Sequence, residues 1–243
     1  MRMPRITAIF LKDLKQYYLK APVLSWGFLF PIAIIALLTL TVKSYGETVM
    51  VPAMFSVSLL FASTTMAQVS VSFEKMNGSI NRLVYAPLSG SDLVVSKSLG
   101  GVFYGLLGVL VSTLSVYLLT GHLIVIHTAY FTVSIILSSL LYSLMSILIA
   151  LLLDPLKTVA TLNIARFSMI FFGGMVIPQA LLPRWMQELT LAFPSLYITD
   201  SIRYGMYNTW QTVDPYTAII VTGIVTVTLY AIAYMTAIKA LTP

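Results

Sequence analysis

Long apolar stretches alternate with short polar segments along the whole chain. Each stretch has about 20 residues or more, the length that an α-helix needs to cross the hydrocarbon core of a bilayer. Four of these stretches carry no Asp, Glu, Lys or Arg, and the other two carry one basic residue each, Lys97 or Arg166. The pattern predicts six transmembrane helices, at residues 22–42, 49–72, 93–120, 130–153, 158–178 and 215–238.

Two regions outside these stretches have patterns of their own. Residues 4–21 are amphipathic at helical spacing, with Ile6, Phe10, Leu14, Tyr17 and Ala21 on one face and Arg5, Lys12 and Gln16 on the other. Such a helix is typical of the headgroup layer. Residues 179–214 contain two apolar pieces, 185–193 and 196–207, that are too short to cross a bilayer, so we predict two short re-entrant helices there. The predicted fold is therefore an all-α membrane protein with one transmembrane domain over residues 1–243.

The segment 73–98, between the second and third predicted spans, is polar and crowded with charge. Gly78, Pro87 and Gly90 interrupt it, and we expect a short helix at 73–85, a turn at 87–90 and a new helix near Asp92. Charges next to a span are expected to be solvated. Replacing Glu74 should then change the free energy of unfolding by at most about 1 kcal/mol.

Composition narrows the class of protein. Hydrophobic residues make up 58% of the chain and charged residues 9%, against about 25% charged in soluble domains. The apolar runs are continuous, unlike the alternating strands of a membrane β-barrel. The absence of cysteine excludes disulfides and thiol chemistry, and His122 and His127 are too isolated to hold a metal, so we expect no metal site. We also expect no catalytic residues in this chain, because it has no paired carboxylates at catalytic spacing and no Ser-His-Asp arrangement.

The distribution of basic residues predicts an orientation. In the six-span arrangement eleven of the 14 Lys and Arg residues fall on the side of the N-terminus. The positive-inside rule therefore places both termini in the cytoplasm of a multi-pass protein of the cell (plasma) membrane. Segment 73–98 would then face the cytoplasm, and 179–214 the exterior. Because these basic residues flank spans, the net charge of +6 does not indicate nucleic-acid binding, and membrane lipid is the expected contact.

Within the spans, a few residues invite specific interpretations. Pro31 should loosen or kink the first helix. The pair Gly101 and Gly105 should allow a neighbouring helix to approach closely, and a face of small residues on the fourth span (Ser139, Ser143, Ser146 and Ala150) should do the same. Arg166 has two interpretations, an anchor that extends to the inner headgroups or a group on a transport pathway.

Two sets of residues resemble the permease subunits of type-2 ABC exporters. The first is Glu74, Gly78, Pro87, Leu88, Ser89 and Lys97, with Ser79 where that family usually has Thr and Asn81 in place of a common acidic residue. The second is Gly173, Gly174, Pro178, Leu182, Pro183, Trp185, Pro194, Asp200 and Arg203. Together the two sets cover nearly the whole chain in the family's order and spacing.

The resemblance implies a subunit that moves a substrate out of the cytoplasm with energy from a separate cytoplasmic ABC ATPase. That partner would bind the ATP and Mg, since no Gly here is followed by Lys as a phosphate-binding loop requires. A second permease copy would complete a dimer, with the path between the second and fifth helices. Glu74, Lys75, Gly78 and Arg82 would then couple to the ATPase, and Arg166, Gly173 and Gly174 would serve the pathway or close packing.

Three alternatives stay open on sequence alone. A motor-independent carrier or channel would need buried ionisable residues, of which only Arg166 qualifies. An intramembrane lipid-modifying enzyme would need a reactive cluster, which the isolated histidines do not supply. Composition does not distinguish a transporter subunit from a non-transporting assembly or immunity protein.

Overall fold

The computed structural model describes residues 3–17, 19–39, 46–79 and 89–241, and within these stretches it contains helices and no strand. The prediction of an all-α protein is confirmed. The elements in order are α1 (Met3–Tyr17), α2 (Ala21–Leu24), the π-helix η1 (Ser25–Leu29), α3 (Phe30–Thr39), α5 (Glu47–Met76), α7 (Gly90–Thr120), α8 (Thr128–Leu152), α9 (Pro155–Phe172), the 3₁₀ turn η2 (Gln179–Leu181), α10 (Arg184–Thr190), α11 (Pro194–Tyr207) and α12 (Pro215–Leu241).

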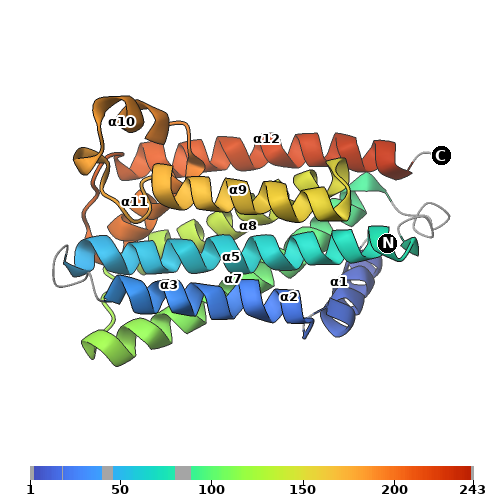
Figure 1. Ribbon diagram of the computed structural model, residues 1–243, viewed down its shortest axis with the longest axis horizontal. Coiled ribbons are helices and arrows are strands. Elements are labelled where there is room, and N and C mark those ends of the chain that lie inside the picture. The colour runs from blue at the N-terminus through green and yellow to red at the C-terminus, as the bar shows by residue number, and fades with distance from the viewer. Residues whose placement is uncertain (1–2, 18, 40–45, 80–88, 242–243) are drawn as a thin grey trace.

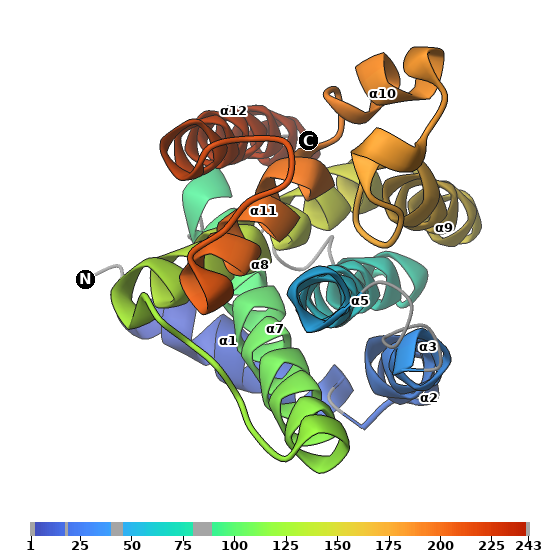
Figure 2. The same cartoon turned by 90° about the vertical axis from the view of Figure 1, so that its left-hand side faces the viewer.

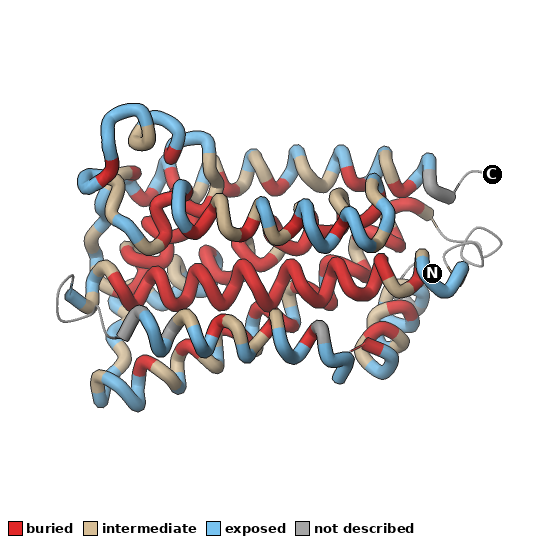
Figure 3. Tube along the Cα trace, in the orientation of Figure 1, coloured by how far each residue is buried: buried red, intermediate tan, exposed pale blue. Residues whose placement is uncertain are grey.

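Helix α5 forms the centre of the bundle. It is surrounded by α3, α7, α8, α9 and α11 (Figures 1 and 2), and every residue from Met50 to Ser72 is buried (Figure 3). The outer helices α7 and α12 instead keep exposed apolar faces, as expected of helices that contact lipid. The buried core is therefore centred on α5 rather than enclosed between two layers of helices.

Four helices of the described part are long and apolar enough to cross a membrane: α5, α7, α8 and α12. The α2–η1–α3 segment and α9 run beside them (Figure 1), but the first is interrupted and the second carries Lys157, Asn163 and Arg166. Multiple crossings are therefore clear, and the six-span topology remains a prediction.

The interruption in the first segment has a local cause. Pro31 has no N–H and its ring collides with the carbonyl four residues earlier, that of Gly27. The chain widens there into the π-helix η1, and the Phe30 N–H donates to the Ser25 carbonyl, five residues back. The predicted loosening at Pro31 is thus a π-turn.

The small residues of α7 and α8 pack as predicted. A Cβ atom added at Gly101 would lie 2.3 Å from the Ser143 hydroxyl oxygen, and one at Gly105 would lie 2.4 Å from that of Ser63 on α5. Larger side chains at these two glycines would separate the three helices.

One end of the bundle carries α1 and the C-terminal end of α12, and the other carries α10 (Figure 1). We call these the α1 end and the α10 end. Helix α1 lies across the bundle axis (Figures 1 and 2). Its buried face is Ile9, Asp13 and Tyr17, rotated from the predicted apolar face, whose Ile6, Phe10 and Leu14 are only half-buried.

Two predicted boundaries are wrong. Residues 73–76 are the last turn of α5 rather than the start of a separate helix, and Asn77 and Gly78 form a turn after it. Residues 80–85 of that predicted helix, with the turn at 87–88, lie outside the described residues. The fifth helix ends at Phe172, not at residue 178, because the chain bends at Gly173 and Gly174. Of the two short helices that follow, α10 is mostly exposed and α11 is packed among α5, α8 and α12.

Candidate functional site

Three helices bring charged side chains together at the α1 end. Glu74 lies in the last turn of α5, Asp13 lies on the buried face of α1, and Lys97 lies in the second turn of α7. The start of α7 is fixed by a capping box, in which the Ser89 hydroxyl accepts from the Asp92 N–H and the Asp92 carboxylate accepts from the Ser89 N–H. This cap fixes the start of α7 at Gly90, about two turns before Lys97.

The ammonium group of Lys97 bridges two carboxylates. Its Nζ lies 2.8 Å from Asp13 Oδ2 and 2.8 Å from Glu74 Oε1. Lys12 donates to the same oxygen of Glu74, and its Nζ is 3.3 Å from Asp13 Oδ1. Lys97, Glu74 and Asp13 are each at most 2% exposed, whereas Lys12 reaches solvent. These four residues, two positive and two negative, are the junction cluster.

Burial and pairing shift the ionisation of the two members on α1. Burial raises the pKa of Asp13 above its usual value, against the opposing effect of the nearby Lys97. Burial lowers the pKa of Lys12, but the hydrogen bond and charge of Glu74 outweigh it, so the pKa is raised overall. At neutral pH the cluster therefore gains from pairing but bears a desolvation cost.

The expectation that Glu74 is a solvated charge is wrong. Its side chain is 1% exposed and holds Lys97, so its removal would leave a buried cation without one of its partners. Sequence reasoning also missed Asp13. The available signal was its position, because it is the only acidic residue of α1 and stands four residues from both Ile9 and Tyr17.

The other residues of the predicted coupling segment take different positions. Lys75 donates to the carbonyls of Leu151 and Leu153, at 2.7 and 3.0 Å, and so caps the C-terminal end of α8. Gly78 follows α5 with φ +64°, and an added Cβ would meet no atom within 4 Å. Its requirement is thus conformational rather than spatial. Arg82 lies outside the described residues.

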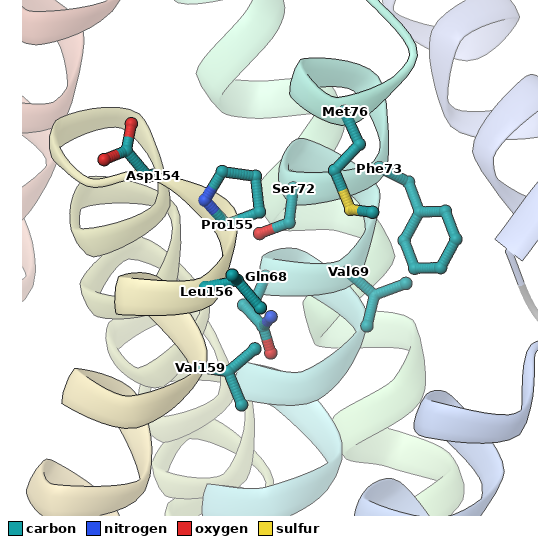
Figure 4. Close-up of a pocket in the computed structure, with 9 residues that line it drawn as sticks. All are labelled: Gln68, Val69, Ser72, Phe73, Met76, Asp154, Pro155, Leu156 and Val159. Atoms are coloured by element: carbon teal, nitrogen blue, oxygen red, sulfur yellow. The ribbon is translucent and has the colours of Figure 1, made fainter.

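A groove runs between α5 and α9 at the α1 end (Figure 4). It encloses about 380 Å³ and is lined by Gln68, Val69, Ser72, Phe73, Met76, Asp154, Pro155, Leu156 and Val159. Its walls are mainly apolar. Met76 and Asp154 lie at one end of the groove, and Gln68 and Val159 lie at the other, which is farther from the end of α5 and which we call the inner end (Figure 4). A groove of this size and lining suits the apolar part of a small molecule.

Arg166 does not extend to the headgroups, so the anchoring interpretation is wrong. Its side chain is 2% exposed and points from α9 to the middle of α5. Its Nε donates to the Thr64 hydroxyl at 2.9 Å and its Nη2 to the Thr65 hydroxyl at 2.8 Å. Its Nη1 donates to the Asn163 amide oxygen at 3.0 Å, and its Cζ lies 5.1 Å from the centre of the Phe61 ring.

The predicted glycines near the α10 end are points of close contact. A Cβ at Gly173 would lie 2.0 Å from the Ser195 hydroxyl oxygen, and Gly174 has φ +66° with a Cβ position 2.7 Å from Leu196. Both glycines thus allow the end of α9 to lie against α11. They are far from the junction cluster, at the opposite end of the bundle.

Asp200 and Arg203 on α11 also meet. They form a buried ion pair, and Asp200 accepts from the backbone N–H groups of Gln211, Thr212 and Val213. Arg203 Nε donates to the Thr48 carbonyl at 2.9 Å. This pair fixes the turn between α11 and α12 and ties it to the start of α5, a role that the sequence did not suggest.

An all-helical bundle with four membrane-length helices and apolar outer faces defines a multi-pass integral membrane protein. The sequence model of the ABC-2 type transporter family matches residues 4–207, and the chain belongs to that family. It is accordingly a permease subunit of a transporter, of a kind that generally works with an ATPase subunit and is typically not catalytic itself. A comparison with curated proteins found no significant match.

Proposed function

We propose that this permease exports a substrate from the cytoplasm with energy supplied by a separate ABC ATPase, which binds ATP and Mg. The observation that carries the proposal is the junction cluster. It joins the surface helix α1 and the start of α7 to the last turn of α5, the helix at the centre of the bundle. A displacement applied beside Glu74 would therefore be transmitted to the helix that forms one wall of the groove.

The proposal includes an orientation in the plasma membrane. The α1 end would face the cytoplasm, since eleven of the 14 basic residues fall on that side in the six-span arrangement. The placement of α1 and the C-terminal end of α12 at the same end of the bundle supports this orientation (Figure 1). Helices α10 and α11 would lie at the exterior face, with α11 as a re-entrant helix.

A second permease copy, identical or related, would complete the pathway. The groove between α5 and α9 is open on one side, so one chain does not enclose a passage there. Two chains that face each other across α5 and α9 would do so. Gly173 and Gly174 would lie near the outer end of that passage, where their close contacts hold α9 against α11.

Gly78 offers a test of coupling with a matched control. Gly78 and Gly121 both have positive φ, +64° and +74°, and both have open space at the Cβ position, but they lie at opposite ends of the bundle. Valine at either glycine should impose similar backbone strain. The two variants differ in distance from the proposed ATPase contact.

The experiment reconstitutes the permease in vesicles with an ABC ATPase that copurifies with it and measures ATP hydrolysis and recovery of the complex. We expect Gly78→Val to uncouple hydrolysis from the permease or to weaken the complex, while Gly121→Val behaves as the wild type. Equal behaviour of both variants, or no effect of the wild-type permease on the ATPase, would contradict the proposed coupling.

A further inference from the structure

Arg166 carries a positive charge that no Asp or Glu side chain balances. All eight Asp and Glu residues lie within the described part of the chain, and none of them forms an ion pair with Arg166. The guanidinium is protonated at any physiological pH. By contrast, the two other buried cations among residues that the structure describes, Lys97 and Arg203, each contact a buried carboxylate.

The position of Arg166 makes an unbalanced charge costly. Its partners Thr64 and Thr65 lie near the middle of α5, with Thr64 twelve residues before Met76, or roughly 18 Å along the helix axis. Two hydroxyls, one amide and the Phe61 ring solvate the guanidinium, but none supplies negative charge. A buried ion is normally paired, because desolvation otherwise destabilises the fold.

Polar side chains connect Arg166 to the groove. Asn163, which accepts from Arg166, is half-buried and lies one helical turn beyond Val159, at the inner end of the groove. On the facing helix, Gln68 lies one turn from Thr64 and also lines the inner end (Figure 4). A negatively charged group at the inner end would thus contact two lining residues that each lie one helical turn from a side chain that accepts from the guanidinium, Asn163 on α9 and Thr64 on α5.

We propose that Arg166 is the recognition element for a negatively charged headgroup, and that the transported molecule is an amphiphile with a carboxylate or phosphate group. This inference rests on the proposed function and specifies its substrate class. A guanidinium presents paired N–H donors that match the oxygens of either group. The apolar walls of the groove, including Val69, Phe73 and Leu156, suit the rest of such a molecule.

The proposed role also explains the depth of the site. A charged headgroup that crosses a membrane inside a protein meets its highest barrier near the middle of the hydrocarbon layer. Arg166 supplies the opposite charge at that depth. The bound headgroup would in turn supply the counter-ion that Arg166 lacks.

Asn163→Asp gives the sharpest test. The Asn163 amide oxygen already lies 3.0 Å from Arg166 Nη1, so a carboxylate of the same shape would become a built-in counter-ion. If Arg166 binds a substrate anion, N163D should compete with it and weaken binding while the fold becomes at least as stable. If Arg166 only joins α9 to α5, N163D should leave binding unchanged.

The assay measures equilibrium binding of tritiated palmitate to the purified permease in neutral detergent at pH 8, with hexadecanol as the uncharged match. Lysophosphatidate and monoacylglycerol form the second pair of probes, and inorganic phosphate is tested as a competitor. We expect both acids to bind more tightly than their neutral matches, and both N163D and Arg166→Gln to weaken acid binding by about 10- to 100-fold. Arg166→Lys should lie between, and Arg184→Gln on the exposed surface of α10 should match the wild type.

Several outcomes would overturn the proposal. They are equal binding of acids and neutral matches, unchanged acid binding in N163D, and a loss of stability in N163D alongside the loss of binding. Displacement of palmitate by millimolar phosphate would indicate a site for free inorganic anions instead. The assay contains no ATPase, so a negative result here leaves ATPase coupling intact, and loss of coupling leaves the binding result intact.

Discussion

The junction cluster makes a quantitative prediction about stability. In Lys97→Met the cluster would retain Asp13, Glu74 and Lys12, so its net charge would change from zero to −1. Both carboxylates are at most 2% exposed, and Lys12, half in solvent, would be the only cation left between them. Removal of one partner from a buried ion pair generally costs about 3–5 kcal/mol, since the remaining charge stays desolvated. We expect K97M to lower the free energy of unfolding by this amount.

A double variant separates charge balance from packing. K97M combined with Asp13→Asn restores neutrality and leaves Glu74 paired with Lys12. Because a buried pair can often be replaced by neutral groups of similar size with little net loss, the second change should recover a large part of the stability. The conservative change Glu74→Gln should destabilise alone, for the same reason as K97M.

The free energies are measured by unfolding the purified protein in mixed micelles with increasing mole fractions of SDS, followed by tryptophan fluorescence and circular dichroism. Each variant is compared with Lys157→Met, a change at an exposed lysine paired only with the exposed Asp154. The charge-balance reasoning is refuted if K97M is as stable as K157M, or if adding D13N makes K97M less stable still.

Three further predictions follow from other features. Burial raises the pKa of Asp13, so above pH 3.8, the usual value, the folded protein keeps a proton that the unfolded chain has released. The contribution of Asp13 to the free energy of unfolding should therefore fall as pH rises through the raised pKa. A pH series of unfolding should show a slope that D13N removes, and an identical slope in both proteins would contradict this prediction. Gly173→Val should lower the free energy of unfolding by about 1–3 kcal/mol, because a Cβ at Gly173 meets the Ser195 hydroxyl oxygen at 2.0 Å. The double variant G173V/S195A should regain part of that stability. The control Gly223→Val should lose none, because its Cβ position is open. The chain has no cysteine, so single cysteines can be introduced at the exposed residues Asn77, Lys157 and Glu188. Those at Asn77 and Lys157 should react with an impermeant reagent only after cells are permeabilised, while the one at Glu188 should react in intact cells. External labelling at Asn77 would contradict the proposed orientation.

Local pattern was enough to predict the helices. Bilayer length and the scarcity of charge constrain each span separately, so the starts of α5, α7, α8, α9 and α12 lie within three residues of the predicted positions. The packing role of Gly101, Gly105 and the serines of α8 was also predictable, since small residues at helical spacing form a face in any straight helix. The π-turn before Pro31 follows from the missing N–H of a single residue.

The meaning of individual charges depended on which helices come together. Glu74 reads as a solvated residue beside a span, but α1 and α7 cover it and supply Lys12 and Lys97. The pairing of Asp13 with Lys97 could not be predicted from the sequence, because the two residues are 84 positions apart. Within its own helix, Asp13 has only Lys12 as a possible partner. Arg166 looks like an anchor when only its distance from the end of α9 is considered.

The class of protein, the helices and the family resemblance could be read from the residues alone, because each rests on local periodicity, composition or the order of motifs along the chain. Helix packing was needed to show that α5 is the central helix, that a cluster of four charges joins it to α1 and α7, and that Arg166 faces Thr64 and Thr65 rather than the headgroups. The free energy of a charge depends on its solvent exposure and on its partners. Both are set by side chains distant in the sequence.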